Sequence, residues 1–353
     1  MRGWWQAAWR LRKIVASPAP NARTRALCHK DGPLDNFTHS LVGWTLGQTG
    51  LKQKSRKGLA ALILGANAPD IDVFLGWVPW APLATHRGFT HSLVGGVLLL
   101  PPMLAVLLWG YDRWQVKRGD HFKSGLEMHF GWLLALCYIG CLTHPLLDWQ
   151  TSYAIQLFTP FDKRWYHTDA LFIADVWIWT GLAYAIWLSR RREKAAEGKW
   201  RRPAVAALAA LVSYISANAA VSDLAADAPR TGEPYANPDI VIVSPAPVLF
   251  WQRDVVWRQN HAISRGKTDS LTPTALGKYS PPIADGMTDP LARKVLLETP
   301  SLASFRRWSI LPMARIERGR CRIVVHFQDA RFGDPGTGRL GTSATVPTGA
   351  PSC

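Results

Sequence analysis

The sequence is poor in charge, in cysteine and in acidic residues. Charged residues make up 19% of the 353, against roughly 25% in soluble domains, and there are only 5 cysteines. So few cysteines exclude a disulfide-stapled miniprotein, and an apolar content of 48% excludes a disordered chain. The first residues contain no apolar segment followed by a cleavage site, so we expect no cleaved signal peptide.

Basic residues and tryptophan are in excess instead. The 41 Lys and Arg against 25 Asp and Glu leave a formal charge of +16, and 18 residues are tryptophan. Indole rings favour the membrane–water interface because they are apolar with one polar group. The basic residues gather in three connections between apolar segments, residues 52–57, 111–127 and 190–202. We therefore interpret the charge as a solvated face at a membrane and predict no nucleic-acid partner.

Apolar segments predict a helical membrane bundle. Four windows have the length of about 20 residues that a membrane helix needs: Ser92–Tyr111, Met128–Leu147, Ala170–Ser189 and Pro203–Ser222. Two shorter stretches, Asn36–Leu51 and Gly58–Pro69, predict a helical hairpin that spans or re-enters the membrane. The fold class is thus a mainly α-helical, polytopic membrane bundle of about four to six membrane helices, some short or re-entrant. The positive-inside rule places the three basic connections in the cytoplasm.

Composition divides the chain into five regions. They are a basic leader or interfacial segment (1–33), a membrane metal-site bundle (34–190), a basic loop and last membrane helix (191–224), a soluble β-rich domain (225–335) and a flexible tail (336–353). Alternating runs at Ile240–Val243, Val248–Trp257 and Cys321–Phe327 predict the strands of the C-terminal, mostly β domain. The predicted topology places this domain outside the cytoplasm, where we expect it to meet a periplasmic partner.

A seven-residue repeat carries the strongest functional information. Phe37–Gly43 recurs without change as Phe89–Gly95, and an apolar run follows each copy. Thr and Ser beside a histidine at a helix start can cap free N–H groups and leave the imidazole at the membrane boundary. A purely capping role is the alternative interpretation, but capping requires no histidine.

Further ionisable residues fall at the same predicted end of the bundle. His144 and Asp148, for example, lie one helical turn apart on one face. Imidazole and carboxylate groups suit zinc, manganese or iron, so we predict one or two divalent ions, with zinc favoured. The candidate metal ligands are His39, Asp70, Asp72, His86, His91, His144 and Asp148.

Other residues have candidate roles in binding and catalysis. Asp70 or Asp148 could act as a catalytic base if it is not a ligand. Arg87 and Arg164 could bind an anionic group such as phosphate, and the alternative is that both anchor the chain at the interface.

These motifs, in this order, resemble a known family. The chain is similar to the YdjM-like family of bacterial inner-membrane proteins, described as metal-dependent hydrolases, some of them LexA-regulated. The long basic leader departs from the family pattern. The motifs that carry the resemblance are Asp35–Ser40, Asn67–Asp72, His86–Ser92, Thr143–Asp148 and Pro160–Trp165.

The residues and the resemblance together predict a membrane-bound, metal-dependent hydrolase. We expect a metal-activated water to cleave an ester or phosphoester of a membrane lipid or lipid-linked substrate at the outer face of the bacterial inner membrane. The C-terminal domain is then periplasmic. The alternative is a non-catalytic metal-binding scaffold or transporter. A transport path requires polar groups in both halves of the membrane, whereas only His129 lies near the other end.

Overall fold

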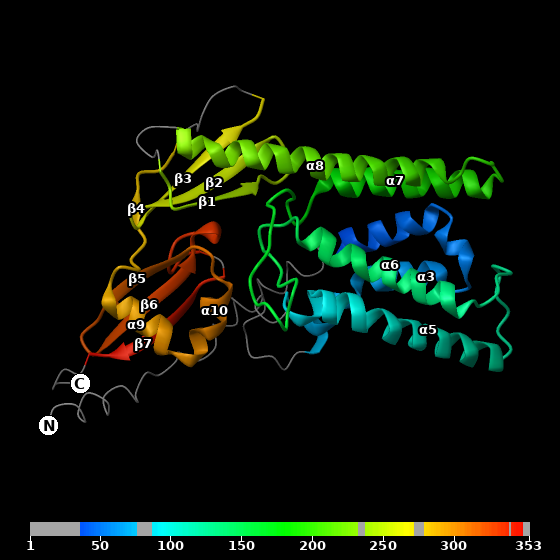
Figure 1. Ribbon diagram of the computed structural model, residues 1–353, viewed down its shortest axis with the longest axis horizontal. Helices are drawn as coiled ribbons and strands as arrows, with labels where there is room; N and C mark the ends of the chain where they lie inside the picture. The colour runs from blue at the N-terminus through cyan, green and yellow to red at the C-terminus, as the bar shows by residue number, and fades with distance from the viewer. Residues whose placement is uncertain (1–35, 76–86, 232–236, 272–278, 339, 349–353) are drawn as a thin grey trace. The chain divides into compact units, whose positions relative to one another are not determined.

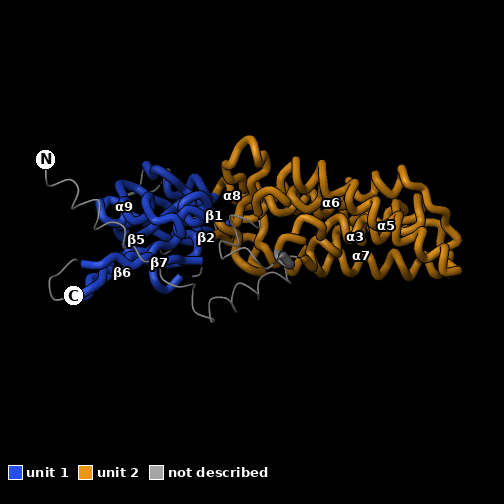
Figure 2. The backbone as a smooth tube through the Cα atoms, turned by 90° about the horizontal axis from the view of Figure 1, so that it is seen from below, with its two compact units in different colours: residues 1–27, 225–243, 254–353 blue, residues 28–224, 244–253 orange. Residues whose placement is uncertain are grey.

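The computed structural model describes residues 36–75, 87–231, 237–271, 279–338 and 340–348. The predicted leader therefore lies outside the described residues. The chain forms two compact units, coloured separately in Figure 2. Unit 2, residues 28–224 and 244–253, contains the helices of the predicted bundle, and unit 1 contains the C-terminal sheets.

The helices of unit 2 run back and forth along a common direction (Figure 1). A helix over residues 36–48 and α3 form the predicted hairpin, since Asn67 Nδ2 at the end of α3 donates to Ser40 Oγ at 3.0 Å. The named helical elements of unit 2, with α8 continuing into unit 1, are η2 (Leu51–Lys54), α3 (Gly58–Asn67), η3 (Ala68–Leu75), η4 (Phe89–His91), η5 (Leu93–Leu99), α5 (Leu100–Lys117), α6 (Phe130–Asp148), α7 (Val176–Lys194) and α8 (Arg202–Thr231).

Three helical segments of the described chain are long and apolar enough to cross a membrane: Leu93–Lys117, Phe130–Asp148 and Arg202–Pro229. They overlap three of the four predicted windows. The fourth, Ala170–Ser189, corresponds to α7, which begins only at Val176 because Asp175 caps it and accepts from the backbone N–H groups of Trp177 and Ile178. The last turn of α7 is basic, and the apolar part of this helix is shorter than the predicted window because the helix starts at Val176.

Close contact between α3 and α6 depends on glycine. A Cβ atom on Gly140 would lie 2.7 Å from the carbonyl oxygen of Leu62 and 3.1 Å from Cα of Gly65. The two backbones meet at these small residues, as small residues permit in membrane bundles.

Substituting Gly140 with leucine should therefore separate α3 from α6. We expect the free energy of unfolding to fall by about 1–3 kcal/mol, because the new side chain meets backbone atoms that cannot move aside. Thermal unfolding of the detergent-solubilised protein measures the change. Gly131→Leu on the same helix is the control, since nothing lies within 4 Å of a Cβ there. Equal destabilisation by both variants would contradict the proposed contact.

The basic connections all lie at the end of the bundle remote from the repeated histidines. At this end a buried ion pair joins the turn before α3 to α5. Arg56 donates to both carboxylate oxygens of Asp112 on α5, at 2.7 and 2.8 Å. Asp112 is fully buried. The bidentate geometry satisfies a carboxylate that the apolar helix would otherwise expose to hydrocarbon.

Unit 1 is built on two sheets, as the alternating runs predicted. One has the strand order β1–β2–β3–β4 and the other the order β5–β6–β7, with antiparallel pairing of β5 with β6 and of β6 with β7. The strands are β1 (Ile240–Pro245), β2 (Gln252–Gln259), β3 (Ala262–Asp269), β4 (Ile283–Ala284), β5 (Pro312–Arg318), β6 (Arg322–Asp329) and β7 (Thr342–Pro347). Two helices, α9 (Pro290–Glu298) and α10 (Ala303–Trp308), complete the unit.

The prediction of a flexible tail from residue 336 is wrong for β7. Thr342–Pro347 pairs with Phe327–Arg322 of β6, and Ala344 is fully buried. Threonine and valine in this strand have high β propensity, and β6 supplies the hydrogen-bonding partner that composition alone does not reveal.

Candidate metal centre

Ends of four helical segments meet at one end of the bundle. His39 lies in the first turn of the helix over residues 36–48, and Asp70 lies just after α3. His91 precedes η5, while His144 and Asp148 occupy the last turn of α6. All five residues are at most 4% exposed. Ionisable groups buried at membrane depth are costly, so such a cluster indicates a function.

Four ligand atoms form a compact set within this cluster. His91 Nε2 lies 3.0 Å from His144 Nε2, and Asp70 Oδ1 lies 3.2 and 3.3 Å from the two nitrogens. Asp148 Oδ2 lies 3.4 Å from His91 Nε2 and 3.6 Å from His144 Nε2. Ligands about 2.0 Å from a tetrahedral zinc ion are separated by about 3.3 Å. These five separations suit one divalent ion held by the two imidazoles, with Asp70 or Asp148 as a further ligand.

The end of α3 fixes the tautomer of His144. Its Nδ1 lies 2.7 Å from the carbonyl oxygen of Ala66, which belongs to the last turn of that helix. Carbonyls in a last turn have no donor within their own helix, so this one is free to accept from Nδ1–H. With the proton on Nδ1, the Nε2 lone pair points into the four-atom set, as metal-binding histidines require.

A hydroxyl group fixes the tautomer of His91 in the same way. Thr90 Oγ1 donates to Asp72 Oδ2 at 2.6 Å, and His91 Nδ1 lies 3.2 Å from the same hydroxyl oxygen. Because the hydroxyl hydrogen is directed at Asp72, its oxygen accepts from Nδ1–H of His91. Asp72 thus lies behind the ligand set and orients it through Thr90.

The remaining histidine contacts the opposite side of Asp148. His39 Nε2 lies 3.4 Å from Asp148 Oδ1, and its ring stacks on that of His144 with centroids 3.8 Å apart. His39, His144 and Asp148 also place ligand atoms within 4.8 Å of one another. His39 therefore belongs to a second group of possible ligands, which shares His144 and Asp148 with the four-atom set.

A buried arginine and the loop after α6 complete the surroundings. Arg87 is 2% exposed, its Nη1 lies 3.1 Å from Asp148 Oδ2, and it donates to Thr151 Oγ1 at 3.3 Å. The loop also forms two backbone hydrogen bonds with the segment over residues 87–93. Gln156 N–H donates to the carbonyl oxygen of Arg87, and Leu93 N–H donates to the carbonyl oxygen of Leu157. The loop thereby holds Arg87 against the cluster.

The chemistry of the donor set fits a divalent cation. Burial raises the pKa of Asp70, but the imidazoles of His144 and His91 more than offset this, so its pKa lies well below the ordinary range. Within the described chain, neither oxygen of Asp148 accepts a hydrogen bond, although both are buried. A buried carboxylate without hydrogen bonds requires a cation, and Arg87 supplies one positive charge beside two carboxylates.

The structure brings together most, but not all, of the predicted site residues. His39, Asp70, Arg87, His91, His144 and Asp148 lie in one cluster. Asp72 lies behind the ligands, and His86 falls outside the described residues. Arg164 is 79% exposed and pairs with Asp162 at 2.7 Å, away from the cluster.

Two groups that orient the ligands are not predicted from the sequence. The sequence indicates only a capping role for Thr90, yet its hydroxyl links His91 to Asp72. The repeat gives one sequence signal for this role, because both copies place a threonine directly before the histidine. The Ala66 carbonyl has no sequence signature at all, since any residue in the last turn of α3 would present one.

Thr90→Val should weaken metal binding while preserving the fold. We expect a 10- to 100-fold loss of affinity, which is typical when a group that orients a metal ligand is removed. Competition with a metal-sensitive chelator dye measures the affinity. Thr38→Val in the other repeat copy is a matched control, because Thr38 accepts from Trp179 Nε1 at 2.7 Å. Equal losses in the two variants would contradict the role of Thr90.

The comparison with known protein families agrees with this site. Residues 34–223, more than half of the chain, match the family described as YdjM inner membrane protein. No curated protein and no solved structure matches the chain. The matched segment contains every residue of the cluster, and the resemblance drawn from the motifs is confirmed. The chain belongs to the YdjM inner membrane protein family.

Proposed function

We propose that the protein is a metal-dependent hydrolase that cleaves an ester or phosphoester of a lipid-like substrate. The observation that carries this proposal is a pair of imidazole nitrogens 3.0 Å apart, each 3.2–3.6 Å from one oxygen of Asp70 and one oxygen of Asp148, with the tautomers of both imidazoles fixed by hydrogen bonds. A divalent ion bound there, with zinc favoured, supplies an acidified water and polarises a phosphoryl or carbonyl oxygen.

The chain's own residues have distinct proposed roles. His91, His144, Asp70 and Asp148 Oδ2 hold the ion. Asp148 Oδ1 and His39 Nε2, 3.4 Å apart, form the pair that accepts a proton from the attacking water. Arg87 lies beside the same carboxylate, where its guanidinium can bind the anionic oxygen of a phosphoester.

The location of the centre supports a substrate from the bilayer. The ligands lie at the ends of candidate membrane helices, the level at which phospholipid ester and phosphate groups are found. The basic connections lie at the opposite end, so the positive-inside rule supports a centre at the outer face and a C-terminal unit in the periplasm. Cys321 of that unit is disulfide-bonded, a state that persists in the periplasm.

A transporter is less well supported than an enzyme. The centre of the bundle between the two polar ends is packed with apolar side chains, among them Leu62, Leu108, Leu133 and Leu136. A non-catalytic scaffold would bind the same metal but would turn over no substrate.

The decisive experiment is a hydrolysis assay on the purified, metal-loaded protein. Phospholipid phosphoesters and carboxyl esters in mixed micelles are the substrates, with Zn²⁺ or Mn²⁺ added. We expect turnover that His39→Ala lowers at least 100-fold while the metal content remains unchanged, because a base contributes about 10²–10⁴-fold to the rate. A metal-loaded protein that leaves every lipid ester intact would favour the scaffold.

A further inference from the structure

A groove along the basic half of unit 2 has no role in the proposed hydrolysis. It runs between the helix over residues 36–48 and α7, and its volume is about 820 Å³. A second hollow of about 390 Å³ shares Trp44, Arg190 and Lys194 with it. The volume of the groove falls within the range of small-molecule sites, about 300–1,000 Å³.

The lining of the groove changes from apolar to cationic along α7. Ala183 and Ile186 line it first, facing Leu41 of the other helix, and Arg190, Arg191 and Lys194 follow. From position 183 to position 194 a helix rises roughly 16 Å, at 1.5 Å per residue. A ligand that fills the groove therefore has an apolar chain at one end and negative charge at the other.

Two tryptophans mark the boundary between these parts. Arg190 lies 5.3 Å from the ring centre of Trp44, and Arg191 lies 5.6 Å from that of Trp187. The indole N–H of Trp44 is buried and finds no acceptor among the described residues. Tryptophan beside arginine is the usual arrangement at the level of lipid head groups.

No described carboxylate neutralises the charge at the cationic end of the groove. Within the described chain, no carboxylate pairs with Arg190, Arg191 or Lys194. Glu193, the acid that lines the second hollow, is held by Lys52 at 2.6 Å. Three cations therefore remain available to a ligand.

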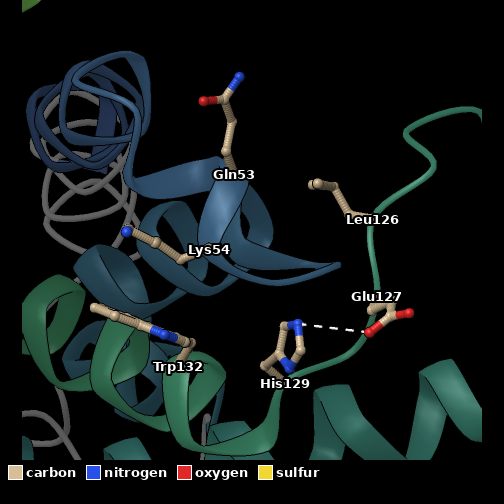
Figure 3. A pocket seen from close by; sticks show the side chains of 6 residues that line it. All are labelled: Gln53, Lys54, Leu126, Glu127, His129 and Trp132. Carbon is tan, nitrogen blue, oxygen red and sulfur yellow. Dashed lines mark ion pairs between the residues drawn. The ribbon is translucent and has the colours of Figure 1, made fainter.

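A smaller hollow at the same end lacks the features that a site for an anionic lipid requires. It measures about 240 Å³ and is drawn in Figure 3. Its one lysine, Lys54, lies over the ring of Trp132, and its acid, Glu127, is 85% exposed and lies 3.8 Å from His129. Mixed charge and the absence of an apolar extension make this hollow unsuitable for an anionic amphiphile.

We propose that the groove between the helix over residues 36–48 and α7 binds an anionic phospholipid. The phosphate lies among Arg190, Arg191 and Lys194, and an acyl chain lies along Leu41, Ala183 and Ile186. Basic pockets between membrane helices bind anionic head groups in this way. A free anion cannot use the apolar part, so the lipid is favoured over phosphate alone.

Lipid titration of the full-length, detergent-solubilised protein, read by native mass spectrometry, tests the proposal. The probes are phosphatidylglycerol, phosphatidylcholine and inorganic phosphate. We expect phosphatidylglycerol to bind at least about tenfold more tightly than phosphatidylcholine, without competition from millimolar phosphate. The variant R190Q/R191Q/K194Q should weaken phosphatidylglycerol binding by at least about tenfold.

A matched variant separates a site from general attraction. R113Q/K117Q/R118Q also removes three exposed cations, from the end of α5 or just beyond it, and should change the affinity less than twofold. Equal losses in the two triple variants, equal binding of the two lipids, or competition by phosphate would each overturn the proposal. If the groove variant does not fold, Arg191→Gln alone should weaken binding about fivefold, and an unchanged affinity would again overturn it.

Discussion

His144→Ala is expected to abolish metal binding without unfolding the bundle. His144 Nε2 belongs to both groups of possible ligands, and the ring contacts the Ala66 carbonyl, His91 and His39. Its removal leaves three donors of the four-atom set and a cavity in its place. Elemental analysis of the purified protein should give about one ion per chain for the wild type and none for the variant.

His39→Ala is the informative comparison, because it also removes a buried imidazole. His39 lies outside the four-atom set, so this variant should retain an ion there. Two ions per wild-type chain, or complete loss of metal in His39→Ala, would show that His39 is a ligand. An undiminished metal content in His144→Ala would contradict the site itself.

Asp329→Asn is expected to destabilise unit 1 by about 3–5 kcal/mol at neutral pH, because it leaves a buried arginine without its counter-charge. The side chains of Asp329 and Arg331 are both fully buried, with Nε and Oδ1 2.8 Å apart. The carboxylate also accepts from Ser309 Oγ and from the backbone N–H groups of Ile310 and Leu311. Chemical unfolding followed by near-ultraviolet circular dichroism measures the loss.

The same carboxylate makes the stability of unit 1 depend on pH. Burial raises the pKa of Asp329, but Arg331 and the hydrogen bonds lower it more, so its folded pKa lies below the ordinary 3.8. The stabilisation is thus complete above about pH 4 and is lost as the pH falls through the folded pKa. Asp329→Asn should lack this acid-dependent loss. Asp334→Asn is the control: its partially exposed pair with Arg265 should contribute at most about 1 kcal/mol.

The convergence of the site could be predicted from sequence because it depends on helix direction. Apolar segments of known length alternate across a membrane, so His39, Asp70, His91 and His144 had to reach the same end. The grouping of ligands could not be predicted in this way. Asp72 lies two residues after Asp70, but Thr90 lies between it and the ligands, and only three-dimensional packing places that hydroxyl there.

The repeat shows the limit of local sequence most clearly. Residues 37–43 are helical throughout, whereas in the second copy η4 ends at His91 and Ser92 caps η5 by accepting from Gly95 N–H. Seven identical residues therefore adopt two backbone conformations. In the first copy Ser40 Oγ instead accepts from Asn67, a partner that lies 27 positions later and that the second copy does not share. Long-range contacts decide the difference.

The buried pair of Arg56 and Asp112 has a consequence for biogenesis. An aspartate near the middle of a membrane helix costs about 2.5–3.5 kcal/mol to insert, and burial near a helix end without a counter-ion is also unfavourable. Arg56 belongs to the hairpin that is synthesised before α5. During synthesis Arg56 is therefore in place before Asp112 leaves the ribosome. The hairpin then supplies the counter-ion that α5 needs when it enters the membrane. Synthesis from the N-terminus thus supplies the partners of this bundle in the order in which the membrane requires them.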